Sequence, residues 1–317
     1  MPVAADLQPL LDAMVEARST PISEASPEDR RALFDEMFGP GGAEMGSVTD
    51  RVILGGDGDD LPVRVYRPTG VASDGPVVVF FHGGGWVIGN LDTHDEVCRA
   101  IAATSDVVVV SVDYRLAPEH PFPAAVDDGY AAVCWVAEHA EDLDVDAGRL
   151  VVAGDSAGGN LSAVVSMLAR DRGGPEVAFQ FLIYPATDFD YETGRWPSLE
   201  ENATGLFLEL DTMRWFRGHL SGGVDLGGDP RAAPIRATSH EGLAPAHIMV
   251  AGFDPLRDEG LGYAAVLNSA GVATTTALHP EQVHGYWNLA ALVPSCGAAR
   301  EADLASLRAT IAALSAD

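Results

Sequence analysis

Residues 151–160 read Val-Val-Ala-Gly-Asp-Ser-Ala-Gly-Gly-Asn, which predicts the end of a buried strand, a Gly-x-Ser-x-Gly turn and the start of a helix. Gly154 and Gly158 leave room on both sides of Ser156, where a Cβ would clash, so the serine hydroxyl is held clear of the backbone on a sharp turn. The positive end of the following helix favours negative charge that develops at this hydroxyl. The stretch therefore indicates a nucleophilic serine.

Two plainer interpretations share part of this pattern. A glycine-rich turn can hold a structural serine, and a phosphate-binding loop also joins a strand to a helix. The phosphate loop fits poorly because no Gly-Lys-Ser or Gly-Lys-Thr follows the turn. A serine nucleophile needs a base, a group that orients the base and donors for an oxyanion, so the rest of the chain distinguishes these interpretations.

Buried strands alternate with helices along most of the chain. Continuous runs of β-branched or aromatic residues predict strands buried on both faces, as in a parallel sheet. Two short alternating strands precede them at 51–68. This succession predicts a mainly parallel sheet covered by helices on both faces. The predicted buried strands lie at 76–81, 107–112, 150–153, 177–183, 247–250 and 272–278, and the helices at 92–104, 123–140, 157–170, 257–270 and 298–314.

Two segments depart from this rhythm. Residues 1–45 have apolar positions at helical spacing, with a helix start at Ser26-Pro27-Glu28. Residues 185–245 contain several aromatic side chains and no strong strand. An insertion of this length in a compact domain is usually functional, often as a lid or a binding loop. We expect the two segments to pack together as a cap.

Backbone donors for an oxyanion are predicted at residues 82–86, His-Gly-Gly-Gly-Trp, directly after a strand. Successive glycines let the backbone approach a ligand and turn bare N–H groups toward it. Together with the amide of Ala157, these groups would hold the negative oxygen of a tetrahedral intermediate. Open α/β sheets bind their ligands at the carboxyl ends of the strands, where both this glycine run and the serine turn are expected.

Asp254 and His284 complete the predicted set. Asp254 comes first after the strand at 247–250 and precedes a proline, whereas capping of the next helix explains Asp258. His284 lies in a loop after the last predicted strand, whereas His279 adjoins that strand. The order serine, aspartate, histidine along the chain is that of an α/β-hydrolase. We therefore predict Asp254 as the orienting acid and His284 as the base.

The amino-acid composition excludes several kinds of binding partner and predicts a cellular compartment. The chain has 47 acidic and 19 basic residues and a formal net charge of -28, which repels nucleic acid, anionic membranes and anionic substrates. Cys98, Cys134 and Cys296 match neither a disulfide framework nor a zinc ribbon. No signal peptide and no apolar stretch of membrane-spanning length is evident. We expect a cytoplasmic protein without a nucleic-acid or membrane partner.

Five motifs together resemble the hormone-sensitive-lipase-like esterases, a bacterial branch of the α/β-hydrolases. The resemblance extends from about residue 50 to the C-terminus, and the motifs fall in the family's order. One departure is Tyr286, where Phe is common after His-Gly. The motifs are His82-Gly-Gly-Gly-Trp86, Asp113-Tyr-Arg-Leu-Ala-Pro-Glu119, Gly154-Asp-Ser-Ala-Gly-Gly159, Asp254-Pro-Leu-Arg-Asp258 and His284-Gly285.

The resemblance implies an α/β-hydrolase fold, with a mainly parallel eight-stranded sheet, helices on both faces and a helical cap. The cap would comprise residues 1–45 and 186–230, and the catalytic domain residues 46–185 and 231–317. The implied activity is that of a serine carboxylesterase that needs neither a metal nor a cofactor.

The resemblance also assigns roles to individual residues. Ser156 would be the nucleophile, His284 the base and Asp254 its orienting acid. The segment 113–119 would brace the glycine loop. The oxyanion hole would be built from Gly84, Gly85 and Ala157, with Gly83 completing the turn.

Substrate choice is only weakly specified. Trp86 and the aromatic residues of the cap indicate an apolar pocket, and we expect Trp86 and Asp155 to contact the substrate. The expected substrate is a small neutral ester with a short-to-medium acyl chain. The same triad also serves hydrolases of amides, carbamates or lactones, and non-catalytic relatives bind ligands but lack the base that His284 would supply. An edge strand near the C-terminus could pair two subunits as a homodimer.

Overall fold

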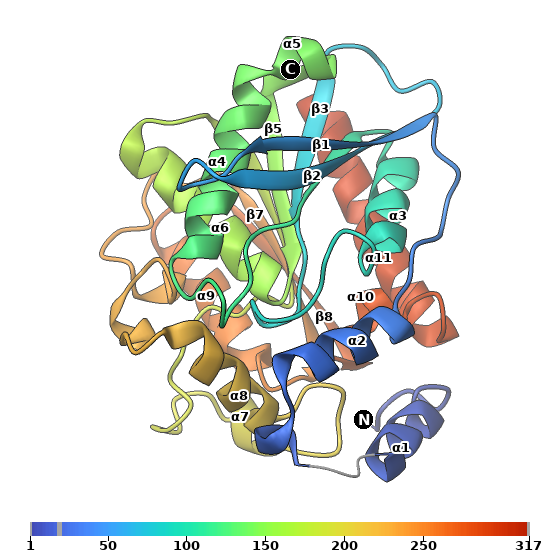
Figure 1. Cartoon of the computed structure of the whole chain (residues 1–317), viewed down its shortest axis with the longest axis vertical. Helices are drawn as coiled ribbons and strands as arrows, with labels where there is room; N and C mark the ends of the chain where they lie inside the picture. The colour runs from blue at the N-terminus through green and yellow to red at the C-terminus, as the bar shows by residue number, and fades with distance from the viewer. Residues whose placement is uncertain (1, 18–20, 316–317) are drawn as a thin grey trace.

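An eight-stranded sheet forms the centre of the computed structural model, which describes residues 2–17 and 21–315 (Figure 1). The strand order is β1-β2-β4-β3-β5-β6-β7-β8. The β1–β2 and β2–β4 pairs are antiparallel, and the other pairs are parallel, so the predicted mainly parallel sheet is confirmed. The strands are β1 Ser47–Leu54, β2 Asp60–Arg67, β3 Gly75–Phe81, β4 Val108–Val112, β5 Val145–Asp155, β6 Val177–Ile183, β7 Ala246–Phe253 and β8 Thr274–Val283.

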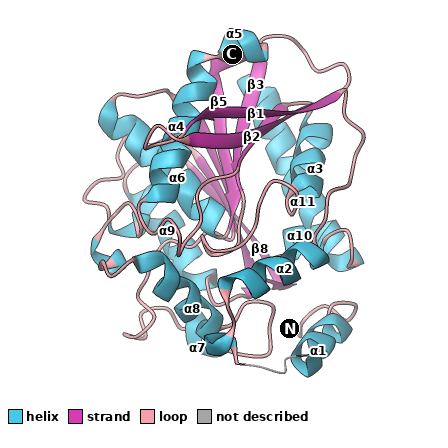
Figure 2. Ribbon diagram, in the orientation of Figure 1, coloured by secondary structure: helices cyan, strands magenta, loops and turns pink. Residues whose placement is uncertain are grey.

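Helices cover both faces of the sheet (Figure 2). In β3, Val77, Val79 and Phe81 pack into one core, which includes side chains of α4, α6 and α9. Val78 and Phe80 of the same strand pack into a second core with α3 and α11. Because both faces are buried, the strand reads as one continuous apolar run. The helices are α3 Asp95–Ser105, α4 Ala124–Glu138, α5 Ala140–Leu143, α6 Ala157–Arg172, α9 Arg257–Ser269, α10 Tyr286–Leu289 and α11 Pro294–Leu314.

Three strands are longer than the sequence predicts. β7 runs from Ala246 to Phe253, beyond the predicted range 247–250 at both ends. β5 begins at Val145, because its pairing with β3 resumes across a register shift. β8 continues past Pro280 to Val283, because a register shift opposite β7 lets the pairing resume there. His284 therefore follows the last strand directly, rather than lying in a loop some residues beyond it.

The two segments expected to form a cap lie on the same side of the molecule in Figure 1. The short helix η1 contacts α8, and the rings of Phe38 and Phe207 lie 6.5 Å apart between their centroids. None of residues 185–245, all of which the structure describes, lies in a strand. The elements of these segments are α1 Gln8–Ala17, η1 Ile22–Glu24, α2 Pro27–Met37, α7 Ser198–Glu201, α8 Leu210–Ser221, η2 Leu226–Gly228 and η3 Pro234–Arg236.

The described part of the chain contains no helix that could span a membrane. None of its helices combines the length and the apolar character that a bilayer crossing requires.

Replacing Leu267 tests the packing of α9 on the sheet. This side chain is completely buried, whereas Leu278 on the edge strand is 51% exposed. We expect Leu267→Ala to lower the free energy of unfolding by about 2–5 kcal/mol through lost burial and a residual cavity. Leu278→Ala should change it by less than about 0.5 kcal/mol. Urea denaturation of both variants measures the difference, and equal effects would contradict the described packing.

Candidate active site

Ser156 lies on a sharp turn between β5 and α6. Its backbone has φ 56° and ψ -113°, a conformation that residues with a side chain rarely adopt. A Cβ on Gly154 would overlap the backbone of Gly158, and one on Gly158 would overlap the carbonyl of Phe81. Only glycine at these two positions lets α6 start so close to β3 and β5. The turn predicted from the glycine pattern is thus present, with Ala157 as the first helical residue.

The structure brings Ser156, His284 and Asp254 together from the ends of β5, β8 and β7. The Nε2 atom of His284 lies 2.9 Å from Ser156 Oγ, and its Nδ1 atom lies 2.8 Å from Asp254 Oδ2. An ionised carboxylate only accepts hydrogen bonds, so Nδ1 carries the hydrogen and Nε2 accepts from the serine hydroxyl. Asp254 is fully buried, and its other oxygen accepts from the amide of Leu256 at 2.8 Å. The serine is therefore placed beside an oriented base.

The rival residues have other partners. Asp258 accepts hydrogen bonds from the amide of Ser198 and from the side chain of Arg257. His279 lies within β8, where its Nε2 atom is 2.7 Å from Asp303. Asp258 and His279 therefore form hydrogen bonds outside the Ser156 cluster.

The glycine loop has an unusual backbone conformation and leaves two of its amides without a partner among the described residues. Gly84, Gly85 and Trp86 have positive φ values of 112°, 60° and 61°. Among the described residues, the amides of Gly84, Gly85 and Ala157 donate to no other group of the chain. These unpaired donors at the carboxyl ends of β3 and β5 are suited to an oxyanion.

Gly83 has a partner within the chain, and the expected substrate contact of Asp155 is wrong. The amide of Gly83 donates to Asp155 Oδ1 at 2.8 Å, so it is unavailable to an oxyanion. Asp155 is buried behind the loop and bonded to Gly83 and His94, so it does not face a substrate. Burial favours a higher pKa for Asp155, but the charge and hydrogen bond of His94 outweigh it and keep this pKa below its ordinary value.

Residues 113–119 support the glycine loop from behind. The hydroxyl of Tyr114 donates to the carbonyl of His82 at 2.7 Å, and the two rings stack at 4.2 Å. The amide of Ala117 donates to the carbonyl of Trp86 at 2.9 Å. Burial, followed by the nearby charge of His94, lowers the pKa of His82 to about 3, so this ring is neutral. These contacts agree with a bracing role.

Aromatic side chains of residues 186–230 lie directly on both loops of the site. A Cβ on Gly85 would overlap the ring of Phe216 from α8. A Cβ on Gly285, next to His284, would lie 2.7 Å from the ring of Phe207. The glycines of both loops therefore make room for the rings above them.

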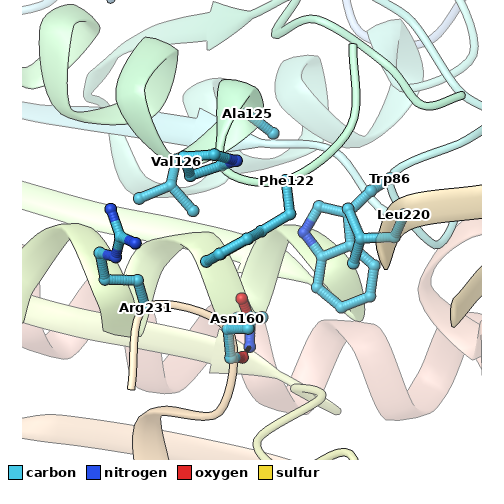
Figure 3. A pocket seen from close by; sticks show the side chains of 9 residues that line it. Trp86, Phe122, Ala125, Val126, Asn160, Leu220 and Arg231 are labelled. Carbon is cyan, nitrogen blue, oxygen red and sulfur yellow. Dashed lines mark hydrogen bonds between the residues drawn. The ribbon is translucent and has the colours of Figure 1, made fainter. Parts of the chain in front are cut away.

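A narrow cavity opens beside Trp86 (Figure 3). The indole of Trp86 lies against it, and Asn160 one turn after Ser156 forms another part of its wall. The space that admits the centre of a water molecule is about 10 Å³, roughly what a single water needs. The lining residues are Trp86, Phe122, Pro123, Ala125, Val126, Asn160, Leu220, Arg231 and Ala232.

Sequence reasoning missed the buried polar residues behind the site, namely His94, Tyr184 and Asn288. His94 lies between the glycine loop and α3, and Asn288 lies in α10, just after His284. The sequence marks His94 and Asn288 in one way, by their position a few residues after the glycine loop and after His284. Among the described residues, no group of three or more His, Cys, Asp or Glu side chains is arranged to hold a metal ion.

Comparison with known proteins gives consistent matches. A family model described as the alpha/beta hydrolase fold matches residues 78–288. Carboxylesterase NlhH of Mycobacterium tuberculosis is 48% identical over 259 residues, covering 80% of each chain. Esterase LipI of the same species is 46% identical over 267 residues, covering 83% of this chain and 82% of LipI. The solved hyperthermophilic esterase of the archaeon Pyrobaculum calidifontis has a TM-score of 0.89 at 38% identity, covering 98% of each chain.

Placing a Cβ on Gly85 tests the contact between the glycine loop and Phe216. Gly85→Ala should lower the free energy of unfolding by roughly 2–4 kcal/mol, because it adds backbone strain and overlaps the ring. Gly70 has a similar φ of 79° with open space around it, so Gly70→Ala isolates the strain, at about 1 kcal/mol. Chemical denaturation compares the two, and a Gly85→Ala cost no larger than that of Gly70→Ala would argue against the described contact.

Proposed function

The chain belongs to the α/β-hydrolase family, in its hormone-sensitive-lipase-like carboxylesterase branch, and on this basis we propose that Ser156, His284 and Asp254 are its catalytic triad. The protein is a serine carboxylesterase. One observation above all supports the residue assignment: hydrogen bonds run from Ser156 through His284 to Asp254 without a gap. A histidine placed between a hydroxyl and a buried carboxylate is the geometry of a base-activated nucleophile.

The proposed reaction proceeds through an acyl-enzyme. His284 Nε2 takes the proton of Ser156 Oγ as this oxygen attacks the ester carbonyl carbon. The tetrahedral intermediate then breaks the bond to the alcohol oxygen, which receives the proton from His284. A water molecule repeats the sequence and releases the acid. Asp254 stays ionised, keeps the hydrogen on Nδ1 and stabilises the imidazolium form of His284.

The carbonyl oxygen of the substrate gains negative charge in this step. The unpaired amides of Gly84, Gly85 and Ala157 support a proposal that they hold it. They are fixed before the substrate arrives, so they need little reorganisation, and the loss of one such donor typically costs about 3 kcal/mol of barrier.

We assign the cavity beside Trp86 to the acyl chain. His284 must reach the leaving oxygen, so the alcohol lies on the β8 side of Ser156. Phe122 adjoins α4, which packs against β3 and β5, so this cavity lies on the opposite side. Its small volume supports a preference for short acyl chains, and the net charge of -28 disfavours anionic substrates. A small neutral ester fits both features.

We further propose that residues 1–45 and 186–230 act as a cap on the catalytic domain formed by residues 46–185 and 231–317. The contacts of Phe216 and Phe207 with the two loops of the site support this division. Arg31 of α2 adds a further link, because its Nε atom donates to the carbonyl of Val87 at 2.8 Å, one residue after Trp86.

A cytoplasmic location and a homodimer are also proposals. The free thiols of Cys98, Cys134 and Cys296 are compatible with a reducing compartment. The edge strand β8 leaves one side without a neighbouring strand, with Leu278 exposed on it, which supports pairing between two subunits.

Removing the nucleophile tests the mechanism. Ser156→Ala should lower the turnover of p-nitrophenyl butyrate by at least about 10⁴-fold, since the acyl-enzyme cannot form. A fluorophosphonate should label the wild-type chain at Ser156 and leave this variant unlabelled, as mass spectrometry would show. Ser162→Ala is the matched control, because Ser162 is buried on the same helix and its hydroxyl donates to the carbonyl of Gly158. Wild-type turnover in purified Ser156→Ala would refute the mechanism.

Enlarging the cavity tests the acyl assignment. Leu220 lines the cavity, and Leu226 is an equally buried leucine of the same segment that does not. Leu220→Ala should raise kcat/KM for octanoyl relative to acetyl p-nitrophenyl esters by about tenfold, because each additional methylene in an apolar pocket matters on this scale. Leu226→Ala should leave the ratio near the wild-type value. An unchanged chain-length profile in Leu220→Ala would place the acyl chain elsewhere.

A further inference from the structure

A buried line of polar contacts joins the loop that carries His284 to the glycine loop. It runs from Asn288 in α10 through His94 and Asp155 to the amide of Gly83. No substrate could reach its middle, because His94 is completely buried and Asp155 is only 4% exposed.

Asp155 fixes the glycine loop to the serine turn. It directly precedes Ser156, and its Oδ1 atom accepts the amide of Gly83 at 2.8 Å. A Cβ on Gly83 would overlap this carboxylate, so the loop lies directly against it. Gly84, which follows, supplies the first of the proposed oxyanion donors. The position of the carboxylate therefore sets where those amides point relative to the serine.

His94 in turn fixes Asp155. Its Nε2 atom lies 3.4 Å from Asp155 Oδ1 and 3.1 Å from Asn288 Nδ2. Its Nδ1 atom lies 3.0 Å from the hydroxyl of Thr93, which donates its own hydrogen to the carbonyl of Asn90. Thr93 therefore accepts from Nδ1. In a neutral ring Nε2 then accepts from Asn288 Nδ2, and it donates to Asp155 Oδ1 when the ring is protonated. The ring is thus held at both nitrogens.

The line also reaches the proposed base. The hydroxyl of Tyr184 donates to Asn288 Oδ1 at 3.4 Å, and the ring of Tyr184 lies 4.5 Å from that of His284. Asn288 is four residues from His284 and lies in the helix that follows it. His94 therefore contacts residues that hold the glycine loop and residues that hold the loop of His284.

Packing alone does not require a polar ring at this position. The rings of Phe34 and Phe80 lie 6.1 and 6.2 Å from His94, so an apolar ring would fit there, but it would leave the buried carboxylate of Asp155 without its histidine partner. Catalysis, by contrast, loses rate steeply when an oxyanion donor moves by about 1 Å. The polar contacts are thus placed where they control that geometry.

We propose that His94 is a positioning residue of the esterase: through Asp155 it sets the orientation of the Gly83–Gly85 amides, and through Asn288 it holds this loop in register with the loop of His284. The proposal rests on the catalytic roles given above. It predicts that loss of His94 weakens binding of the transition state and spares binding of the ester.

The test replaces His94 and compares two readouts. His94→Phe should keep the packing and lower kcat for p-nitrophenyl butyrate by about 10–100-fold. This fall in kcat is no larger than the fall caused by removing a whole oxyanion donor. KM should stay within about twofold of the wild-type value. Affinity for a trifluoromethyl ketone, which forms a tetrahedral adduct on the serine, should fall by the same factor as kcat/KM. His94→Gln, whose amide can still donate to Asp155, should recover most of the loss.

Two further variants guard against misfolding and test the connection. Asn288→Leu breaks the line at its other end and should also lower kcat with KM unchanged. Asp155→Asn combined with His94→Phe should cost no more than the larger single effect, because both act through Gly83. His240→Phe is the matched control, a buried histidine whose ring contacts the carbonyl of Pro234, and it should keep the wild-type kcat.

Several outcomes would overturn the proposal. Unchanged kcat in folded His94→Phe or Asn288→Leu, additive losses in the double variant, or a ketone affinity that does not follow kcat/KM would each do so. If His94→Phe does not fold, Asn288→Leu and His94→Gln decide by the same criteria. Fluorophosphonate labelling of Ser156 in each variant keeps the two questions separate, because a failure of the triad assignment removes the label and a failure of this proposal does not.

Discussion

The close contact between Gly158 and the carbonyl of Phe81 is the constraint on which the rest of the site depends. No side chain fits between the first turn of α6 and the end of β3, so the helix starts directly on the strand. This contact forces Ser156 into its unusual backbone conformation. It also brings the loop that follows Phe81 beside Ala157. The proposed nucleophile and the proposed oxyanion donors are therefore neighbours through backbone packing, before any side chain contributes.

Buried carboxylates then fix what the backbone brings together. Asp254 and Asp155 both lie at the carboxyl end of a strand, and each is bonded to a histidine and to a backbone amide. An unpaired charge at such depth would be costly, so these partners stabilise the folded chain as well as holding the geometry. In the proposed mechanism the two aspartates differ in task, since Asp254 orients the base and Asp155 anchors the glycine loop. Because the two aspartates lie on different strands, one holds the loop of His284 and the other holds the glycine loop.

The segments proposed as a cap contribute to the site in a different way. Phe216 and Phe207 lie on Gly85 and Gly285, so these segments contact the site through its backbone rather than through charge. The same segments leave only a narrow space beside Trp86. Chemistry and selectivity are thus divided between the sheet, which supplies the reacting groups, and the surrounding helices, which set the available room.

The sequence by itself determined the sheet, the serine turn and the candidates Ser156, Asp254 and His284, because buried strands, glycine turns and strand ends leave local patterns. Only the tertiary structure decided that Asp155 lies behind the glycine loop, that the amide of Gly83 is already bonded and that β8 extends to His284. Those facts depend on contacts between residues far apart along the chain and on a register shift between two strands. No local pattern encodes them, since each arises only when separate elements pack against one another.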